Sequence, residues 1–150
     1  MITLTTKWQQ VETTLQWLLD RADFTILYFY PKDNTPWCTI EAVDFAKNIK
    51  KFDELKTQVI WVSKDNYSSH CKFADKHGLN FDLISDPDFV LHKKFDAVGE
   101  KSMYGKKYIW TIRSTFLLNK KWEILKDWRD VSASGHVENI LAILDKIINS

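Results

Sequence analysis

Residues 25–45 read TILYFYPKDNTPWCTIEAVDF and contain an apolar run followed by a helical pattern. Residues 25–30 form an uninterrupted apolar and aromatic run that ends at Pro31. Such a run, bounded by turn residues, predicts a strand that is buried on both faces. From Pro36 the apolar residues recur at helical spacing, which predicts a helix through about Lys50. The stretch therefore predicts a central strand that leads directly into an amphipathic helix.

Strands and helices continue to alternate after this stretch. Strand-like runs cover residues 58–63, 81–84 and 115–118, and the last is followed by a turn and a hairpin partner at 122–128. Helical patterns cover residues 68–77, about 86–95 and about 134–148. Residues 2–4 and 11–13 are candidates for an N-terminal hairpin. This order predicts an α/β chain with a thioredoxin-like fold, in which helices flank a central mixed β-sheet.

Size and composition are those of one domain. The chain has 150 residues, 45% of them hydrophobic, so we expect a single thioredoxin-like domain over residues 1–150. The 21 basic and 20 acidic residues nearly balance, and nucleic acid is not an expected partner. The longest apolar stretches are of strand length and the first residues do not form a secretory signal, so we expect no membrane segment and a cytoplasmic location.

Cys38 stands in the first turn of the predicted helix. Free backbone N–H groups and the positive end of the helix dipole favour negative charge there, and the thiolate is the nucleophilic form of cysteine. Thr35, a candidate N-cap three residues earlier, has a hydroxyl that can donate to the sulfur or accept from a substrate. Cys38 is therefore a candidate reactive thiol. The alternative is a buried cysteine that serves only as a small hydrophobic residue.

Residues 28–45 closely resemble the active-site segment of the peroxiredoxins, in the branch of the bacterioferritin comigratory protein. The family pattern of Pro, three residues, Thr, two residues and Cys is met by Pro31, Thr35 and Cys38. Residues 112–118 resemble the strand that carries the family's active-site arginine, here Arg113. Further matches follow in the family order at residues 69–78, 85–86, 103–106 and 135–136. The resemblance thus covers most of the chain with several separate motifs.

This resemblance implies a thiol-dependent peroxidase that reduces hydrogen peroxide and organic hydroperoxides. The Cys38 thiolate would attack a peroxide oxygen and become a sulfenic acid, while Arg113 would stabilise the thiolate and hydrogen-bond the peroxide. Thr35 would hold the two oxygens in line, and Pro31 would shield the sulfur from water. Glu41 resembles the glutamate of the family motif and is a candidate partner of Arg113. The alternative for Glu41 is a carboxylate favoured only by the nearby helix N-terminus.

The second thiol of the reaction departs from the commonest family pattern. Many members of the branch carry a resolving cysteine five residues after the attacking one, where this chain has Val43. The only other cysteine is Cys71, on the helix predicted at 68–77, where some members place their resolver. Either Cys71 forms a disulfide with Cys38 after the first helix unwinds locally, or Cys38 is a one-Cys enzyme reduced by an external thiol.

A thioredoxin-like reductant is the expected protein partner, with no cofactor and with a monomer or weak homodimer as the assembly. The alternative function is a non-catalytic redox-sensing or binding module of the same fold, because the usual resolving cysteine is absent. A thiol–disulfide oxidoreductase is disfavoured since the chain has no Cys-x-x-Cys motif. The four histidines lack zinc-site spacing, so no metal is expected, and His70 is expected to be an exposed helical residue.

Overall fold

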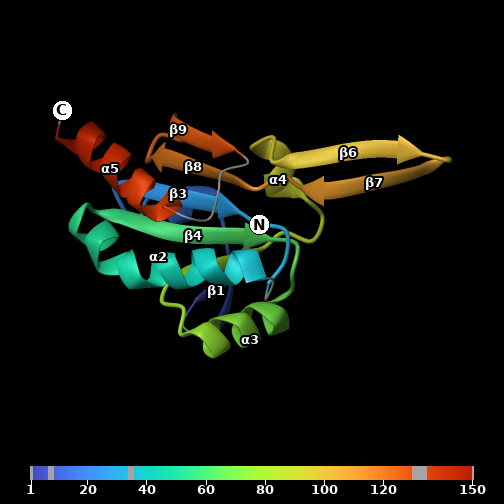
Figure 1. Ribbon diagram of the computed structural model, residues 1–150, viewed down its shortest axis with the longest axis horizontal. Coiled ribbons are helices and arrows are strands. Elements are labelled where there is room, and N and C mark those ends of the chain that lie inside the picture. The colour runs from blue at the N-terminus through green and yellow to red at the C-terminus, as the bar shows by residue number, and fades with distance from the viewer. Residues whose placement is uncertain (1, 7–8, 34–35, 130–134, 150) are drawn as a thin grey trace.

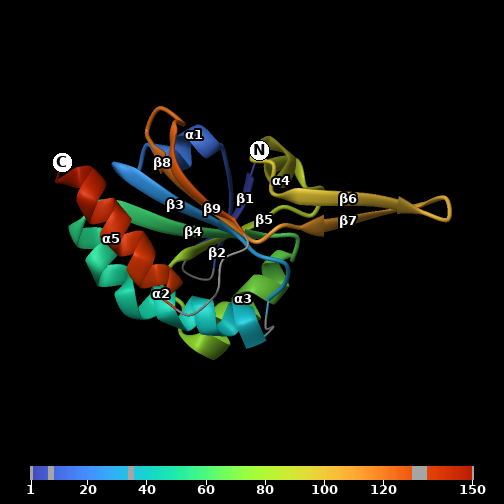
Figure 2. The ribbon, with the colours of Figure 1, turned by 45° about the horizontal axis from the view of Figure 1, so that its top comes forward.

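The computed structural model describes residues 2–6, 9–33, 36–129 and 135–149. Within these residues the main sheet has seven strands in the order β2-β1-β5-β4-β3-β8-β9 (Figures 1 and 2). The strands are β1 (Ile2–Thr6), β2 (Gln9–Thr13), β3 (Phe24–Phe29), β4 (Thr57–Ser63), β5 (Asp82–Ser85), β8 (Ser114–Asn119) and β9 (Ile124–Arg129). Strand β3 pairs in parallel with β4, and β4 with β5, whereas the other neighbours in this sheet are antiparallel. The sheet is therefore mixed, as the sequence predicts.

Helices cover both faces of the sheet (Figures 1 and 2). They are α1 (Leu15–Leu19), α2 (Pro36–Glu54), α3 (Tyr67–His77), α4 (Val90–Lys94) and α5 (His136–Ile148). Helices α2, α3 and α5 pack over Tyr28, Tyr30 and Trp61 on one face. Helices α1 and α4 pack over Phe29 and Phe116 on the other. Alternate residues of β3 point into the two cores on opposite faces of the sheet, which explains why the strand is apolar along its whole length.

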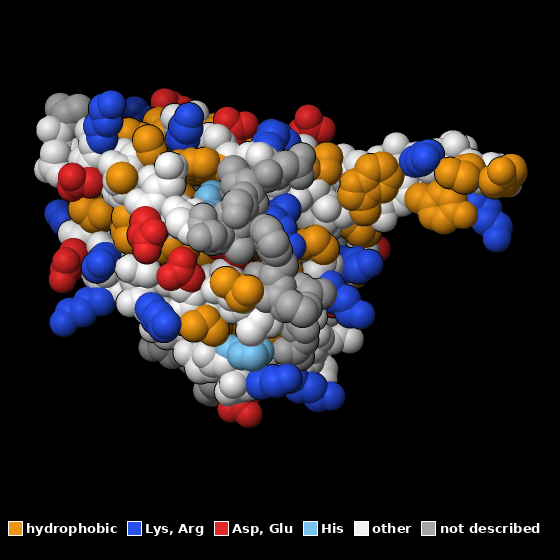
Figure 3. Space-filling view, in the orientation of Figure 1, with side chains coloured by type: hydrophobic (Ala, Val, Ile, Leu, Met, Phe, Trp, Pro, Cys, Tyr) orange, Lys and Arg blue, Asp and Glu red, His pale blue; other side chains and the backbone are white. Residues whose placement is uncertain are grey.

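A separate two-stranded hairpin projects from the body of the molecule (Figures 1 and 3). It consists of β6 (Val98–Met103) and β7 (Lys106–Thr111), and the N–H of Ile112 closes its base by donating to the carbonyl of Ala97 at 2.8 Å. Its exposed hydrophobic side chains are Met103, Tyr104, Tyr108 and Trp110. The chain that leaves β7 enters β8 through Arg113, so the hairpin and this candidate site residue share one segment.

The predicted elements are confirmed, with shifted ends. The N-terminal hairpin forms as β1 and β2, but the sequence analysis did not predict α1 or the β6–β7 hairpin. The helix expected from about residue 86 begins only at Val90, because the chain first makes a turn in which Phe89 adopts a left-handed φ of 58° and donates its N–H to the carbonyl of Asp86. Ser134, the expected start of the last helix, lies outside the described residues.

Candidate active site

Cys38 is the third residue of α2 and is fully buried in the core beneath that helix. Because α2 follows β3 after a short loop, its N-terminus lies at the carboxyl end of the central strand (Figure 1). The backbone N–H groups in the first turn of a helix have no partner within the helix and can stabilise a negative charge. The structure therefore confirms the placement of Cys38 that the sequence predicts.

Arg113 contacts Cys38 across 75 residues of sequence, with its Nη2 donating to Sγ at 3.5 Å. Its Nη1 donates to the hydroxyl of Tyr28 at 2.7 Å. Tyr28 lies in β3, and the antiparallel pairing of β3 with β8 sets Phe29 opposite Ser114, the residue after Arg113. The pairing of two strands thus places the guanidinium at the thiol. Tyr28 is a site residue that no sequence motif indicated. Its alternation with Phe29 predicts only that the two side chains face opposite sides of the sheet, and in the structure Tyr28 faces α2.

Burial and charge fix the protonation of the groups around this contact. Burial lowers the pKa of Arg113, but Tyr28 and Cys38 raise it more, and the net pKa lies above its usual value. Burial, with a contribution from Glu41, raises the pKa of Tyr28, so its hydroxyl remains protonated. Burial and the nearby Arg113 lower the pKa of His136 to about 4. At neutral pH the guanidinium is therefore charged, whereas the phenol and the imidazole are neutral.

Glu41 lies on α2 one turn after Cys38 and is fully buried. Neither of its carboxylate oxygens has a hydrogen-bond partner among the described residues. Burial raises the pKa of Glu41 to about 8, although Arg113 opposes this shift. A carboxyl group with this pKa is mostly neutral at pH 7, since desolvation disfavours its charged form. Glu41 therefore affects Arg113 through proximity, and in its neutral form it leaves the positive charge of the guanidinium available to other groups.

The remaining predicted residues occupy the loop after β3 and helix α3. Pro31 is half-buried in the loop, and Thr35 lies outside the described residues. Cys71 is half-buried on α3 and, like Cys38, is a free thiol. A hydrogen bond with Cys71 raises the pKa of the Tyr67 hydroxyl. Helix α3 packs into the same core as Cys38 and contacts α2, so both thiols belong to neighbouring helices.

The expectation for His70 is wrong, because this side chain is fully buried. Its Nδ1 lies 2.8 Å from Oδ2 of Asp33, and its Nε2 lies 3.2 Å from the carbonyl oxygen of Ile84. The helical pattern of α3 could not indicate this burial, since both partners come from distant segments of the chain. Across the described ranges no three His, Cys, Asp or Glu side chains are grouped so that they could hold a metal ion. Nor does that part of the chain contain a helix that is long and apolar enough to cross a membrane.

Comparison with known proteins identifies the family of this chain. The chain matches the AhpC/TSA family over residues 2–126. It is 43% identical over 119 residues to Peroxiredoxin Bcp of Xanthomonas campestris pv. campestris, which covers 79% of this chain and 74% of the relative. It is 42% identical over 124 residues to Peroxiredoxin Bcp of Bacillus subtilis, which covers 83% of this chain and 79% of the relative.

A solved structure shows the same similarity in three dimensions. It is the bacterioferritin comigratory protein of Xanthomonas campestris, studied for its alkyl peroxide reduction activity. It superposes on this chain with a TM-score of 0.87 and 37% identity, covering 98% of this chain and 90% of that one. The chain therefore belongs to the AhpC/TSA family, within the bacterioferritin comigratory protein branch of the peroxiredoxins, and is a thiol-dependent peroxidase with a thioredoxin-like fold.

Proposed function

We propose that this protein reduces hydroperoxides with Cys38 as the attacking thiolate and Arg113 as the cation that activates it. The observation that carries the proposal is the 3.5 Å contact between Nη2 of Arg113 and Sγ of Cys38 at the N-terminus of α2. A guanidinium and a helix N-terminus both favour the thiolate over the thiol. The planar fork of the guanidinium also offers N–H donors to the peroxide oxygens, on which negative charge develops during the reaction.

The reaction breaks the O–O bond and forms an S–O bond. The thiolate attacks one peroxide oxygen, Cys38 becomes a sulfenic acid, and the other oxygen leaves as hydroxide or alkoxide and takes up a proton. Neutral Glu41 supports this step, because a charged carboxylate near Arg113 would weaken the attraction between the guanidinium and the thiolate. Pro31 shields the sulfur from water. The family resemblance assigns Thr35 to holding the two oxygens in line.

We further propose that Cys71 resolves the sulfenic acid. Its thiolate attacks the Cys38 sulfur, hydroxide leaves and takes up a proton to become water, and a disulfide joins α2 to α3. The packing of the two helices against each other supports this pairing, and the burial of Cys38 requires the first turn of α2 to open before the sulfurs meet. A thioredoxin-like dithiol then reduces the disulfide. Neither step requires a second copy of the chain, so we propose a monomer or a weak homodimer as the working unit. We propose the cytoplasm as its location, because both cysteines are free thiols, as is usual in a reducing compartment.

Intact-mass analysis tests both assignments. Reduced wild-type protein, Cys71→Ser and Cys38→Ser are each mixed with one equivalent of hydrogen peroxide, and their masses and free thiols are measured. We expect wild type to lose about two hydrogens as it forms a disulfide, and Cys71→Ser to gain about one oxygen as the sulfenic acid. Cys38→Ser is expected to stay unchanged over the same time. Rapid oxidation of Cys38→Ser would contradict the peroxidase site, and a sulfenic acid in the wild type without a disulfide would support the one-Cys route.

A further inference from the structure

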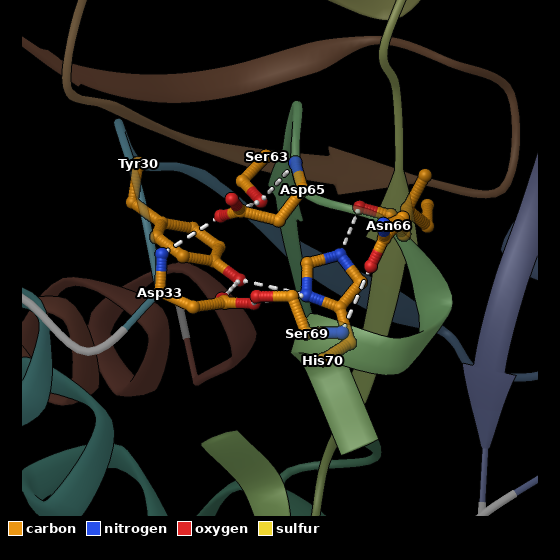
Figure 4. A network of polar contacts seen from close by, with 8 residues as sticks. Tyr30, Asp33, Ser63, Asp65, Asn66, Ser69 and His70 are labelled. Atoms are coloured by element: carbon orange, nitrogen blue, oxygen red, sulfur yellow. Dashed lines mark hydrogen bonds and ion pairs between the residues drawn. The ribbon is translucent and has the colours of Figure 1, made fainter. Parts of the chain in front are cut away.

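A cluster of buried polar side chains lies between the loop after β3 and helix α3 (Figure 4). Asp33 accepts a hydrogen bond from the Tyr30 hydroxyl at 2.5 Å and another from the Ser69 hydroxyl at 2.8 Å. Its Oδ2 also lies 2.8 Å from Nδ1 of His70. Asp33 and His70 are 4% and 0% exposed. Separating a buried carboxylate from these partners is costly, because no water is available inside the core to replace the lost hydrogen bonds.

The backbone of the same loop has a second attachment. The N–H of Asp33 donates to Oδ2 of Asp65 at 2.7 Å, and the Ser63 hydroxyl donates to the same oxygen at 2.9 Å. Asn66 caps α3 by accepting a hydrogen bond from the Ser69 N–H at 2.9 Å. The loop is thus attached to the start of α3 through both its side chain and its backbone (Figure 4).

The position of the cluster in the chain relates it to both thiols. Asp33 lies in the loop that enters α2, five residues before Cys38, and His70 directly precedes Cys71 on α3. Cys38 is fully buried, so any reagent larger than a small peroxide reaches its sulfur only when the first turn of α2 moves. The contacts of Asp33 oppose that movement, because they hold the preceding loop against α3.

We propose that Asp33 and His70 form a latch that holds the loop before α2 against α3 and thereby sets how often the first turn of α2 opens to expose the Cys38 thiol. Both are positioning residues, since neither contacts the sulfur and both act through the loop. The effect of the latch on the accessibility of Cys38 does not depend on the reaction that this thiol performs. Its consequence for the disulfide rests on the proposed function, in which Cys71 is the resolver.

Alkylation of Cys38 without peroxide measures the opening directly. In a Cys71→Ser background, the rate of reaction with iodoacetamide is followed by mass spectrometry over a range of pH. The rates of the variants are compared at the high-pH plateau, where a change in the pKa of Cys38 no longer alters the fraction of thiolate. We expect Asp33→Asn and His70→Gln each to raise the plateau rate about tenfold, as the loss of one strong buried contact predicts. Ser69→Ala, which removes a single hydrogen bond to Asp33, is expected to raise the rate about threefold.

The two main variants separate a latch from a simple charge effect. Asp33→Asn replaces the carboxyl group itself, whereas His70→Gln leaves that carboxyl group in place. A charge effect on the thiolate would therefore not accelerate both, but a latch does. Asp86→Asn is the matched control, because Asp86 Oδ2 lies 2.6 Å from Nδ1 of the buried His92, which packs against Phe29 on the opposite face of the sheet. We expect this control to leave the alkylation rate within about twofold of its parent.

The latch is contradicted if the plateau alkylation rates of His70→Gln and Ser69→Ala both stay within twofold of the parent rate. This comparison decides the question even if Asp33→Asn does not fold. An equal acceleration by Asp86→Asn also overturns it, since the effect would then reflect global destabilisation. With Cys71 restored and one equivalent of hydrogen peroxide added, the latch variants are expected to form the disulfide about tenfold faster than wild type. Faster alkylation together with no disulfide in any protein, wild type included, supports the latch and contradicts Cys71 as resolver.

Discussion

The Arg113 guanidinium donates to both the Cys38 thiol, which it activates in the proposed reaction, and the Tyr28 hydroxyl, which we expect to orient it. Since Tyr28 is buried and stays protonated, it offers the guanidinium a neutral oxygen without offsetting its charge. Glu41 behaves in the same way near neutral pH, because burial keeps its carboxyl group largely protonated. These three residues together leave the positive charge directed at the sulfur.

Substitution of Arg113 and Tyr28 separates activation from orientation. We expect Arg113→Ala to lower the second-order rate constant for hydrogen peroxide by about 10²–10³-fold, as the loss of a preorganised donor to a developing anion predicts. Tyr28→Phe keeps the guanidinium and removes its 2.7 Å acceptor, so a smaller loss, about tenfold, is expected. Both constants are measured by stopped-flow tryptophan fluorescence. An Arg113→Ala enzyme as fast as wild type would contradict the assigned role of the guanidinium.

The raised pKa of Glu41 predicts a characteristic pH dependence of stability. Its pKa rises from the usual 4.5 when unfolded to about 8 when folded, so the folded state binds more protons between these values. The free energy of unfolding contributed by this group therefore falls as pH rises from about 4.5 to about 8, by at most about 1.4 kcal/mol per pH unit. Urea unfolding of Cys38→Ser with and without Glu41→Gln checks this. The difference in free energy of unfolding between the proteins with and without Glu41→Gln should change as pH rises from about 4.5 to about 8. A difference that stays constant over this range would mean that Glu41 is already ionised in the folded protein.

In the proposed reaction, helix α2 carries the attacking thiol and its first turn has to open for that thiol to be resolved. Its first turn contains Cys38, and Val43 occupies the position where many relatives carry their resolver. Two residues five apart on an intact helix point in different directions, so a disulfide between them requires the turn to unwind. The proposed partnership with Cys71 requires the same release.

Val43→Cys in a Cys71→Ser background tests whether the first turn of α2 can unwind. We expect one equivalent of hydrogen peroxide to produce a disulfide between positions 38 and 43, seen as the loss of two thiols and confirmed by peptide mapping. Val43→Ser in the same background is the control and should accumulate the sulfenic acid. Persistent sulfenic acid in the Val43→Cys protein would show that α2 stays wound, which would also weaken the case for Cys71.

Sequence patterns predicted the elements better than the contacts between them. The run through β3 and the helical spacing of α2 are local features, so both were correctly predicted, and Cys38 at the helix start followed from them. The link between Arg113 and Cys38 came only from the family resemblance, because strand pairing brings them together. The burial of His70 depends on Asp33, 37 residues away, and no local pattern encodes it. The β6–β7 hairpin was missed since both strands are largely exposed and lack alternating burial.

The molecule combines a body, in which helices cover both faces of the seven-stranded sheet, with a hairpin that forms a separate two-stranded sheet. The hairpin base is closed by the Ala97–Ile112 bond, and Trp110 lies across Gly99, where an added Cβ would meet the indole. Beyond that pair the strands are mostly exposed. The outer part of the hairpin therefore contributes little apolar burial to the stability of the body.

Shortening the hairpin tests this independence. Replacement of residues 101–108 by Asn-Gly, a favoured two-residue hairpin turn, retains the pair Glu100 and Ile109 and everything closer to the base. We expect the free energy of unfolding to change by less than about 1 kcal/mol, and the peroxide rate constant to stay within about threefold of wild type. Urea unfolding and stopped-flow kinetics check both values. A large loss of either would mean that the outer hairpin supports the body or the position of Arg113.

In the proposed reaction, the thiolate of Cys38 is the group that reduces the peroxide. The most direct test of this assignment is the stopped-flow reaction of the reduced protein with excess hydrogen peroxide, compared among wild type, Cys71→Ser and Cys38→Ser. We expect a fast fluorescence phase whose rate is proportional to peroxide concentration in the wild type and in Cys71→Ser, and no such phase in Cys38→Ser. A fast phase that survives in Cys38→Ser, or one that is absent from the wild type, would contradict the assignment.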